Sequence, residues 1–242
     1  MTYSFGDVLR PAPGVISGLR PTKPGFVFSR DLGFVFAKPV FFAADDAAYR
    51  PGGKIGSMNY YGPKDLAGSF RTVRKNTITI AEEIGEQHYG FSPAPETRTV
   101  AQTLVHIGLG PRMAQQVHGV ERRTTLEGFD FPGFVQKIVA EEKVQRNKAQ
   151  IVAFLREEGD KFAGWVDSLS DDFLGQYITM PPGMQPASKT RFEMIAGVKE
   201  HEMHHRGQLM LMERMVGIVP HLTREMQARM ASMNAQAAGK PA

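Results

Sequence analysis

The segment Lys199-Glu-His-Glu-Met-His-His-Arg-Gly-Gln-Leu209 lies near the end of a long helical pattern and holds three of the seven histidines of the chain. Residues four apart are separated by about 40° around an α-helix. His201 and His205 therefore project from one face of the helix, close enough to bind a single metal ion. Histidine pairs with this spacing on a helix are a recurrent site for transition metals.

The apolar pattern places this pair on the side of the helix that faces the core. Apolar residues spaced three to four positions apart form a stripe along this helix: Met194, Val198, Leu209, Met212 and Val216. His201 and His205 fall inside the stripe, whereas His204 lies on one side of it and Glu202 on the other. An unpaired buried polar group costs about 1–3 kcal/mol, and a shared metal would satisfy both rings. The alternatives are two core histidines bonded to carboxylates or water, or a helix turned to expose them.

A useful site needs a third ligand, because catalytic zinc sites generally take three protein ligands and keep one position open. His106 is the best candidate, since it lies in mid-helix between Val105 and Ile107. The carboxylates of Glu82, Glu83 and Glu86 are alternatives, either as ligands or as acceptors for a histidine N–H. The simpler interpretation of these carboxylates is a solvated helix face.

Composition restricts the chemistry further. The chain of 242 residues is 42% hydrophobic and has no cysteine, which excludes disulfides, thiolate ligands and a cysteine nucleophile. Histidine, aspartate and glutamate remain as metal ligands. No run of 18 apolar residues indicates a membrane span, and the N-terminus lacks a signal-peptide pattern. We therefore expect a cytoplasmic protein without a membrane partner.

The positive charge is concentrated at the N-terminus. Of 29 Lys and Arg and 25 Asp and Glu in the chain, residues 1–57 hold seven basic residues and four acidic ones. The remainder, with 22 basic and 21 acidic residues, is close to neutral. Because no basic stripe emerges, the sequence argues against nucleic acid as a partner.

Helical periodicity begins at Pro63 and predicts an all-α protein. We expect long helices over residues 64–87, from after Pro95 to about 117 with a break at 108–111, over 134–168, and over 189–216. A short terminal helix over 220–233 follows. Four long helices favour a four-helix bundle, in which inward-facing side chains build metal sites.

The two ends of the chain lack the helical periodicity of this domain. Residues 1–57 are rich in glycine and proline without helical periodicity, and predict a poorly structured extension that is disordered or loosely docked. A mis-assigned start upstream of Met58 would also explain them. We expect the metal-binding domain over 58–233 and a frayed tail over 234–242.

Over residues 58–233 the sequence resembles the DinB-like family of bacterial four-helix proteins, also called YfiT/DinB-like metalloenzymes. The segments that carry the resemblance are Gly90-Phe-Ser-Pro93, Thr99-Val-Ala-Gln-Thr-Leu-Val-His106, His201-Glu-Met-His-His-Arg-Gly-Gln-Leu209 and Gly217-Ile-Val-Pro220. The resemblance implies a divalent metal, often zinc or nickel, on His106, His201 and His205. In one departure, Thr97-Arg-Thr99 occupies the region where the family commonly has a tryptophan.

Such a site supports two chemistries on a small-molecule substrate. It can lower the pKa of bound water for hydrolysis, or present a low-molecular-weight thiol as a thiolate nucleophile, the mode that related families suggest. We therefore expect a metal-dependent hydrolase or a thiol-dependent S-transferase, with Glu82, Glu86 and His204 as candidate general bases. The alternative is a non-catalytic, metal-stabilised helical protein of stress response or dimerisation. Methionines of the last long helix (Met210, Met212, Met215) would suit a homodimer or fill the core.

Overall fold

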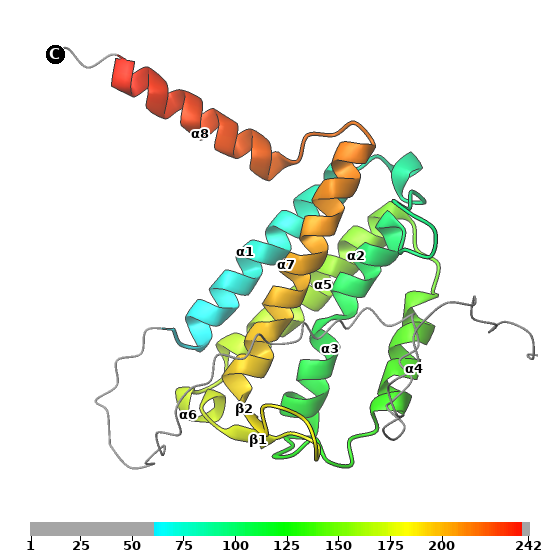
Figure 1. The fold of residues 1–242 in the computed structure, drawn as a ribbon, viewed down its shortest axis with the longest axis vertical. Coiled ribbons are helices and arrows are strands. Elements are labelled where there is room, and N and C mark those ends of the chain that lie inside the picture. Colours follow the sequence, from blue (N-terminus) through cyan, green and yellow to red (C-terminus); the bar gives the residue numbers. More distant parts are fainter. Residues whose placement is uncertain (1–60, 239–242) are drawn as a thin grey trace, which may run out of the picture. The chain divides into compact units, whose positions relative to one another are not determined.

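The computed structural model describes residues 61–238. Four long helices lie side by side in it (Figure 1): α1 (Pro63–Glu83), α2 (Val100–Leu109), α5 (Lys148–Asp167) and α7 (Arg191–Met215). Helices α1 and α2 each pack against both α5 and α7. The predicted all-α four-helix bundle is confirmed. The expected extension over residues 1–57 lies outside the described residues, and the expected domain boundaries stay predictions.

Local sequence signals determine where the bundle helices begin. Thr99, Asn147 and Thr190 each accept a hydrogen bond from the backbone three residues on, and the side chain at that position bonds back. Each capping box satisfies two backbone N–H groups that the first helical turn would leave unpaired. Gly217, with a φ of 84°, follows the end of α7, where glycine adopts the left-handed conformation without steric cost.

The break predicted at residues 108–111 is present. Helix α2 ends at Leu109, and Pro111 begins the short helix α3 (Pro111–Ala114), which continues into a π-helical turn, η2 (Gln115–Val120). A 3₁₀ turn, η1 (Glu86–His88), follows α1. The main core joins α1, α2, α5 and α7 through side chains such as Ile80, Leu104, Leu155 and Leu209.

The third helical region, expected as one segment over 134–168, consists of two helices. Helix α4 (Phe131–Glu142) ends five residues before the Asn147-capped α5 begins. It packs beside α2 and has no fully buried residue. The apolar periodicity was misleading here because both helices share it, whereas the Asn147–Gln150 capping box marks the true start of the bundle helix.

The remaining elements are small or peripheral. Helix α6 (Asp171–Leu174) precedes an antiparallel pair of short strands, β1 (Tyr177–Thr179) and β2 (Ser188–Thr190). Helix α8 (His221–Ala238) follows α7 and continues beyond the expected end at Met233, since Ala235, Ala237 and Ala238 favour helix. Within residues 61–238, no helix is both long and apolar enough to cross a membrane.

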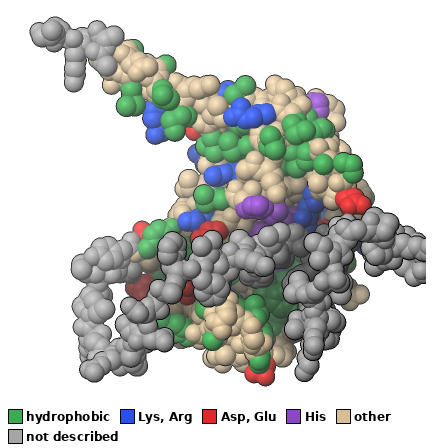
Figure 2. Space-filling model, viewed as in Figure 1, with side chains coloured by type: hydrophobic (Ala, Val, Ile, Leu, Met, Phe, Trp, Pro, Cys, Tyr) green, Lys and Arg blue, Asp and Glu red, His purple; other side chains and the backbone are tan. Residues whose placement is uncertain are grey.

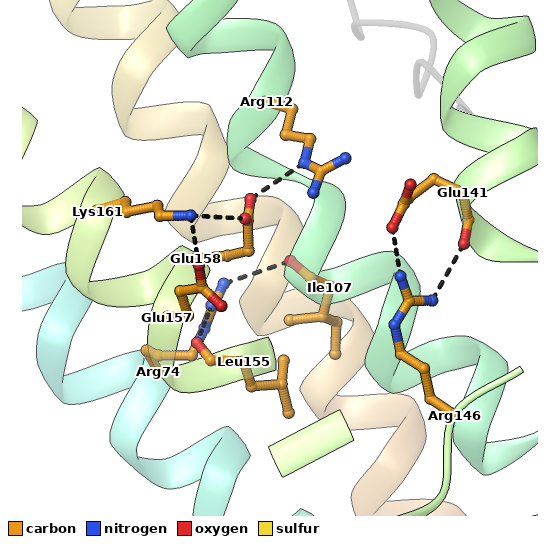
Figure 3. A network of polar contacts seen from close by, with 9 residues as sticks. All are labelled: Arg74, Ile107, Arg112, Glu141, Arg146, Leu155, Glu157, Glu158 and Lys161. Atoms are coloured by element: carbon orange, nitrogen blue, oxygen red, sulfur yellow. Dashed lines mark hydrogen bonds and ion pairs between the residues drawn. The ribbon is translucent and has the colours of Figure 1, made fainter. Parts of the chain in front are cut away.

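One buried ion pair, the Arg74–Glu202 clamp, ties all four bundle helices together. Arg74 of α1 donates to Glu202 of α7 at 2.9–3.1 Å. It also donates to the Leu155 carbonyl of α5 at 2.7 Å and to the Ile107 carbonyl of α2 at 3.3 Å (Figure 3). Arg74 is 3% exposed and Glu202 is 1% exposed. Glu202, which the helical phase places beside the apolar stripe, is buried as well, because Arg74 supplies the charge that allows its burial.

Candidate metal centre

Three histidine side chains meet between α2 and α7. The Nε2 atom of His201 lies 3.1 Å from Nε2 of His106 and 3.1 Å from Nε2 of His205. Within residues 61–238, this is the one group of three or more potential metal-ligating side chains whose ligand atoms all lie within 4.8 Å of one another. His205 is buried and the other two are partly exposed. Figure 2 shows histidine side chains reaching the surface near the middle of the viewed face.

The backbone around the break in α2 makes room for this arrangement. A Cβ atom added to Gly110 would lie 3.1 Å from Nδ1 of His201 and 3.3 Å from the Ile107 carbonyl oxygen. Glycine at this position therefore lets the His201 ring lie against the end of α2. Behind the ring cluster, the Arg74–Glu202 clamp contacts Ile107, which follows His106, while Glu202 itself follows His201. The clamp thus links the two backbone segments that carry the histidines.

Two acceptors determine which ring nitrogen carries the proton. Nδ1 of His106 lies 2.5 Å from the Glu142 carboxylate of α4, and Nδ1 of His205 lies 2.8 Å from the Gln208 amide oxygen. A carboxylate and an amide oxygen accept hydrogen bonds, so each Nδ1 donates. In a neutral ring the lone pair is then on Nε2, which faces the other histidines. This is the arrangement that metal-ligating histidines adopt.

The surroundings keep the rings of His201 and His205 neutral. Burial lowers the pKa of His201 to about 3, and the neighbouring histidines lower it as well. Burial also lowers the pKa of His205 to about 4, despite the opposing hydrogen bond to Gln208. Burial alone would raise the pKa of Glu142, but its hydrogen bond with His106 and the charges of His106 and Arg98 hold it below the usual range. At neutral pH, His201 and His205 are therefore neutral and Glu142 is ionised.

The donor set fits a divalent transition metal. Three imidazole ligands suit zinc, nickel, copper and iron. A tetrahedral zinc ion with Zn–N bonds of about 2.0–2.1 Å separates its ligand nitrogens by about 3.3 Å. The two Nε2 separations of 3.1 Å are close to this value. Without a metal, the lone pairs of His106 and His205 would both face the same His201 nitrogen, which can donate only one hydrogen.

The three candidate general bases are not all at this centre. His204 is exposed, and its Nε2 lies 3.3 Å from the Gln208 amide nitrogen, so it connects to His205 through Gln208. The carboxylate of Glu82 instead pairs with Arg156 of α5. That of Glu86 lies 3.4 Å from the backbone nitrogen of Lys148. The structure thus brings His204 near the histidine cluster and engages Glu82 and Glu86 elsewhere.

Sequence reasoning did not identify Glu142 as part of the site. The carboxylate comes from α4, 36 positions after His106, and Arg98 lies 3.7 Å from the same oxygen. Only the fold of the intervening chain brings α4 beside α2. Gln208, three residues after His205 on the same helix, contacts His205.

Solved structures of similar fold support the architecture. YfiT from Bacillus subtilis is 13% identical, with 70% of this chain and 94% of that chain covered and a TM-score of 0.52. An uncharacterized protein from Clostridium difficile 630 is 15% identical, with 65% and 98% covered and a TM-score of 0.50. YfiT is described as a probable metal-dependent hydrolase with an unusual four-helix bundle topology. No curated protein matches the chain.

A third structure corrects one expectation. The colibactin self-resistance protein ClbS is 16% identical, with 62% of this chain and 94% of that chain covered and a TM-score of 0.46, and its structure is a complex with double-stranded DNA. The exclusion of nucleic acid, drawn from the near-neutral charge, is therefore wrong. A charge balance summed over the chain does not report how basic side chains are distributed over one face of the molecule.

The relationship of the chain is established by its sequence as well as its fold. The family model for the DinB superfamily matches residues 69–209, which is more than half of the chain. The match begins within α1, ends within α7, and includes all three clustered histidines. The chain belongs to the DinB superfamily.

Proposed function

We propose that this protein is a divalent-metal-dependent hydrolase whose metal is held by His106, His201 and His205. The observation that carries the proposal is the convergence of the Nε2 atoms of the three histidines. In His106 and His205 the other ring nitrogen, Nδ1, donates to Glu142 and Gln208. Zinc and nickel both suit such a donor set. The description of YfiT as a probable metal-dependent hydrolase supports the same reaction class.

When bound, the metal would lower the pKa of a water molecule and polarise a carbonyl group. The chain itself supplies orientation and proton transfer. Glu142 and Gln208 hold the rings of His106 and His205 in the ligating tautomer. His204 is an exposed imidazole connected to Gln208, and we assign to it the transfer of a proton from water to the leaving group. Hydrolysis then joins the water oxygen to the carbonyl carbon as the C–O or C–N bond breaks.

Two expectations drawn from the sequence are not tested by the structure and stay predictions. Use of a low-molecular-weight thiol stays a prediction, as does a cytoplasmic location. The non-catalytic alternative is less well supported, because two of the three histidines are partly exposed, whereas a structural metal site is normally closed.

The test is hydrolysis of a panel of ester and amide substrates by metal-free, zinc-loaded and nickel-loaded protein. We expect activity in a metal-loaded form that is lost in His201→Ala, reduced in His204→Ala, and retained in His88→Ala, a control histidine in η1. A parallel reaction of an electrophile with a thiol examines the transferase alternative. Metal-dependent thiol transfer without hydrolysis would replace the proposed reaction, and the absence of both would refute an enzymatic role for these reactions.

A further inference from the structure

A cavity of about 610 Å³ lies between α3, η2, the loop of residues 121–130, α4 and α5. Its volume falls within the range of about 300–1,000 Å³ that is typical of small-molecule sites. It is lined by apolar, cationic and anionic side chains, and the apolar and charged side chains lie on different walls. The arrangement of these groups indicates the kind of molecule that it would bind.

One wall is apolar and contains two aromatic rings. Phe129 and Phe134 line the cavity with their ring centroids 5.9 Å apart, and Ile138 lies one helical turn further along α4. Both phenylalanines and Ile138 are partly buried. The Arg123 guanidinium lies 5.6 Å from the centre of the Phe129 ring and closes one side. This wall would contact an aromatic or branched aliphatic group.

The other wall carries charged side chains, and among the cations that line the cavity only Lys137 lacks an ion pair within residues 61–238. Glu158, which is 8% exposed, lies between two cations (Figure 3). Its carboxylate is 3.1 Å from Arg112 Nε and 3.7 Å from Lys161 Nζ. Lys161 Nζ also lies 2.6 Å from the Glu157 carboxylate, so the two cations of this wall are matched by two carboxylates. Across the cavity, Lys137 of α4 makes no ion pair with any residue in the range 61–238.

The acidic groups at the rim have partners other than Lys137. Glu121 pairs with Arg123 at 2.8 Å, and Asp130 accepts the backbone N–H of Gly133 at the start of α4. Arg112, Arg123 and Lys161 thus each have a carboxylate partner, and Lys137 is the lining cation that has none within residues 61–238. A ligand with one negative charge would therefore be favoured over a neutral or cationic ligand of the same shape.

Two segments that line the cavity also carry residues that contact the histidine cluster. Ile138 is one helical turn before Glu142, which holds His106, and that turn spans about 6 Å. On the opposite side, Arg112 follows two residues after Gly110, against which the His201 ring lies. The walls of the cavity and the histidine cluster thus involve the same two segments, which is the basis for expecting one end of a bound molecule near the metal.

We propose that this cavity is the substrate-binding site and takes an organic carboxylate with an aromatic or branched aliphatic body. Phe129, Phe134 and Ile138 bind the apolar body, and Lys137 with Arg112 binds the carboxylate. The assignment as a substrate site rests on the proposed hydrolase function, whereas binding of the anion does not. The substrate class is then an ester or amide that carries a carboxylate and an apolar group.

Binding can be measured without any reaction, using three probes of the same shape and different charge. We expect 4-phenylbutyrate to bind more tightly than 4-phenylbutanol, and 4-phenylbutylamine to bind most weakly, by titration calorimetry or ligand-detected NMR. Lys137→Glu should weaken binding of 4-phenylbutyrate by at least about fivefold, the upper range for one exposed ion pair. Phe134→Ala should weaken all three, and Lys75→Glu on the exposed face of α1 should change none.

Equal affinity for the three probes, or identical effects of Lys137→Glu and Lys75→Glu, would overturn the proposal. Its relation to the metal centre has a separate measurement. With cobalt-loaded protein, we expect paramagnetic relaxation of bound 4-phenylbutyrate, and none with zinc. Selective binding of the anion without relaxation would place it away from the metal and overturn the substrate assignment. Selective binding with relaxation but no hydrolysis of any panel member would retain the site and count against the proposed reaction.

Discussion

Replacing Arg74 by methionine tests whether the Arg74–Glu202 clamp organises the bundle behind the histidines. The substitution removes every hydrogen bond that Arg74 makes and leaves the Glu202 carboxylate, 1% exposed, without its cation. Removal of one partner from a buried ion pair costs about 3–5 kcal/mol. By contrast, Arg74→Met/Glu202→Leu removes both charges together, and replacement of a buried pair by apolar residues is often neutral or stabilising.

We therefore expect the double variant to be at least about 3 kcal/mol more stable than Arg74→Met alone. The assay is urea unfolding of the metal-free protein followed by circular dichroism. Arg71→Met is the matched control on the same helix, because the Arg71–Asp167 pair is exposed, with a separation of 3.4 Å, and such pairs contribute about 0–1 kcal/mol.

The double variant also separates folding from positioning. With the link between Ile107 and α7 removed, we expect it to fold and yet to bind zinc more weakly, with an altered absorption spectrum when cobalt is bound. Equal destabilisation in the single and double variants would refute the argument that unpaired Glu202 is the main cost. Unchanged zinc affinity and cobalt spectrum would refute the positioning role.

Three further outcomes follow from the contacts. Glu142→Gln should lower zinc affinity by about 10–100-fold in a chelator competition, and an unchanged affinity would show that the hydrogen bond to His106 does not matter. Burial and a neighbouring carboxylate raise the pKa of Glu213 from 4.5 to about 7. The folded state thus binds this proton more tightly than the unfolded state, and stability falls as pH rises from about 4.5 through 7. Glu213→Gln should flatten that decline when the melting temperature is measured against pH. Parallel curves for the variant and the unmodified protein would contradict this prediction. Gly159→Ala should destabilise α5 because the added Cβ would lie 2.8 Å from Cγ of Arg74. At Gly164 an added Cβ would have no atom within 4 Å, so Gly164→Ala should stabilise the protein by about 0.5–1 kcal/mol in urea unfolding. Equal effects of the two substitutions would count against the close approach at Gly159.

Much of the fold was predictable because local signals determine it. The apolar spacing in α1, α2 and α7 locates the helices, and the glycine and proline at 110–111 predict the break in α2. The spacing of His201 and His205 is likewise a local property of one helix. The separation of α4 from α5 was also encoded locally, in the Asn147 capping box, but the apolar periodicity obscured it.

What the sequence could not show are the contacts between distant segments. Burial of Glu202 depends on Arg74, 128 positions earlier, and periodicity alone placed it only beside the apolar stripe. Glu142 reaches His106 only because α4 packs beside α2. In both cases a charged side chain would ordinarily be assigned to solvent, and only a partner from another helix explains its position.

The central claim is that His106, His201 and His205 bind one divalent ion, and metal content tests it most directly. Elemental analysis of protein purified without an affinity tag, beside His201→Ala/His205→Ala, gives the stoichiometry. We predict about one divalent ion per chain in the unmodified protein, and its loss from a variant that keeps the helical circular dichroism spectrum. Absence of metal from the unmodified protein, with no uptake of added zinc or nickel, would contradict the claim.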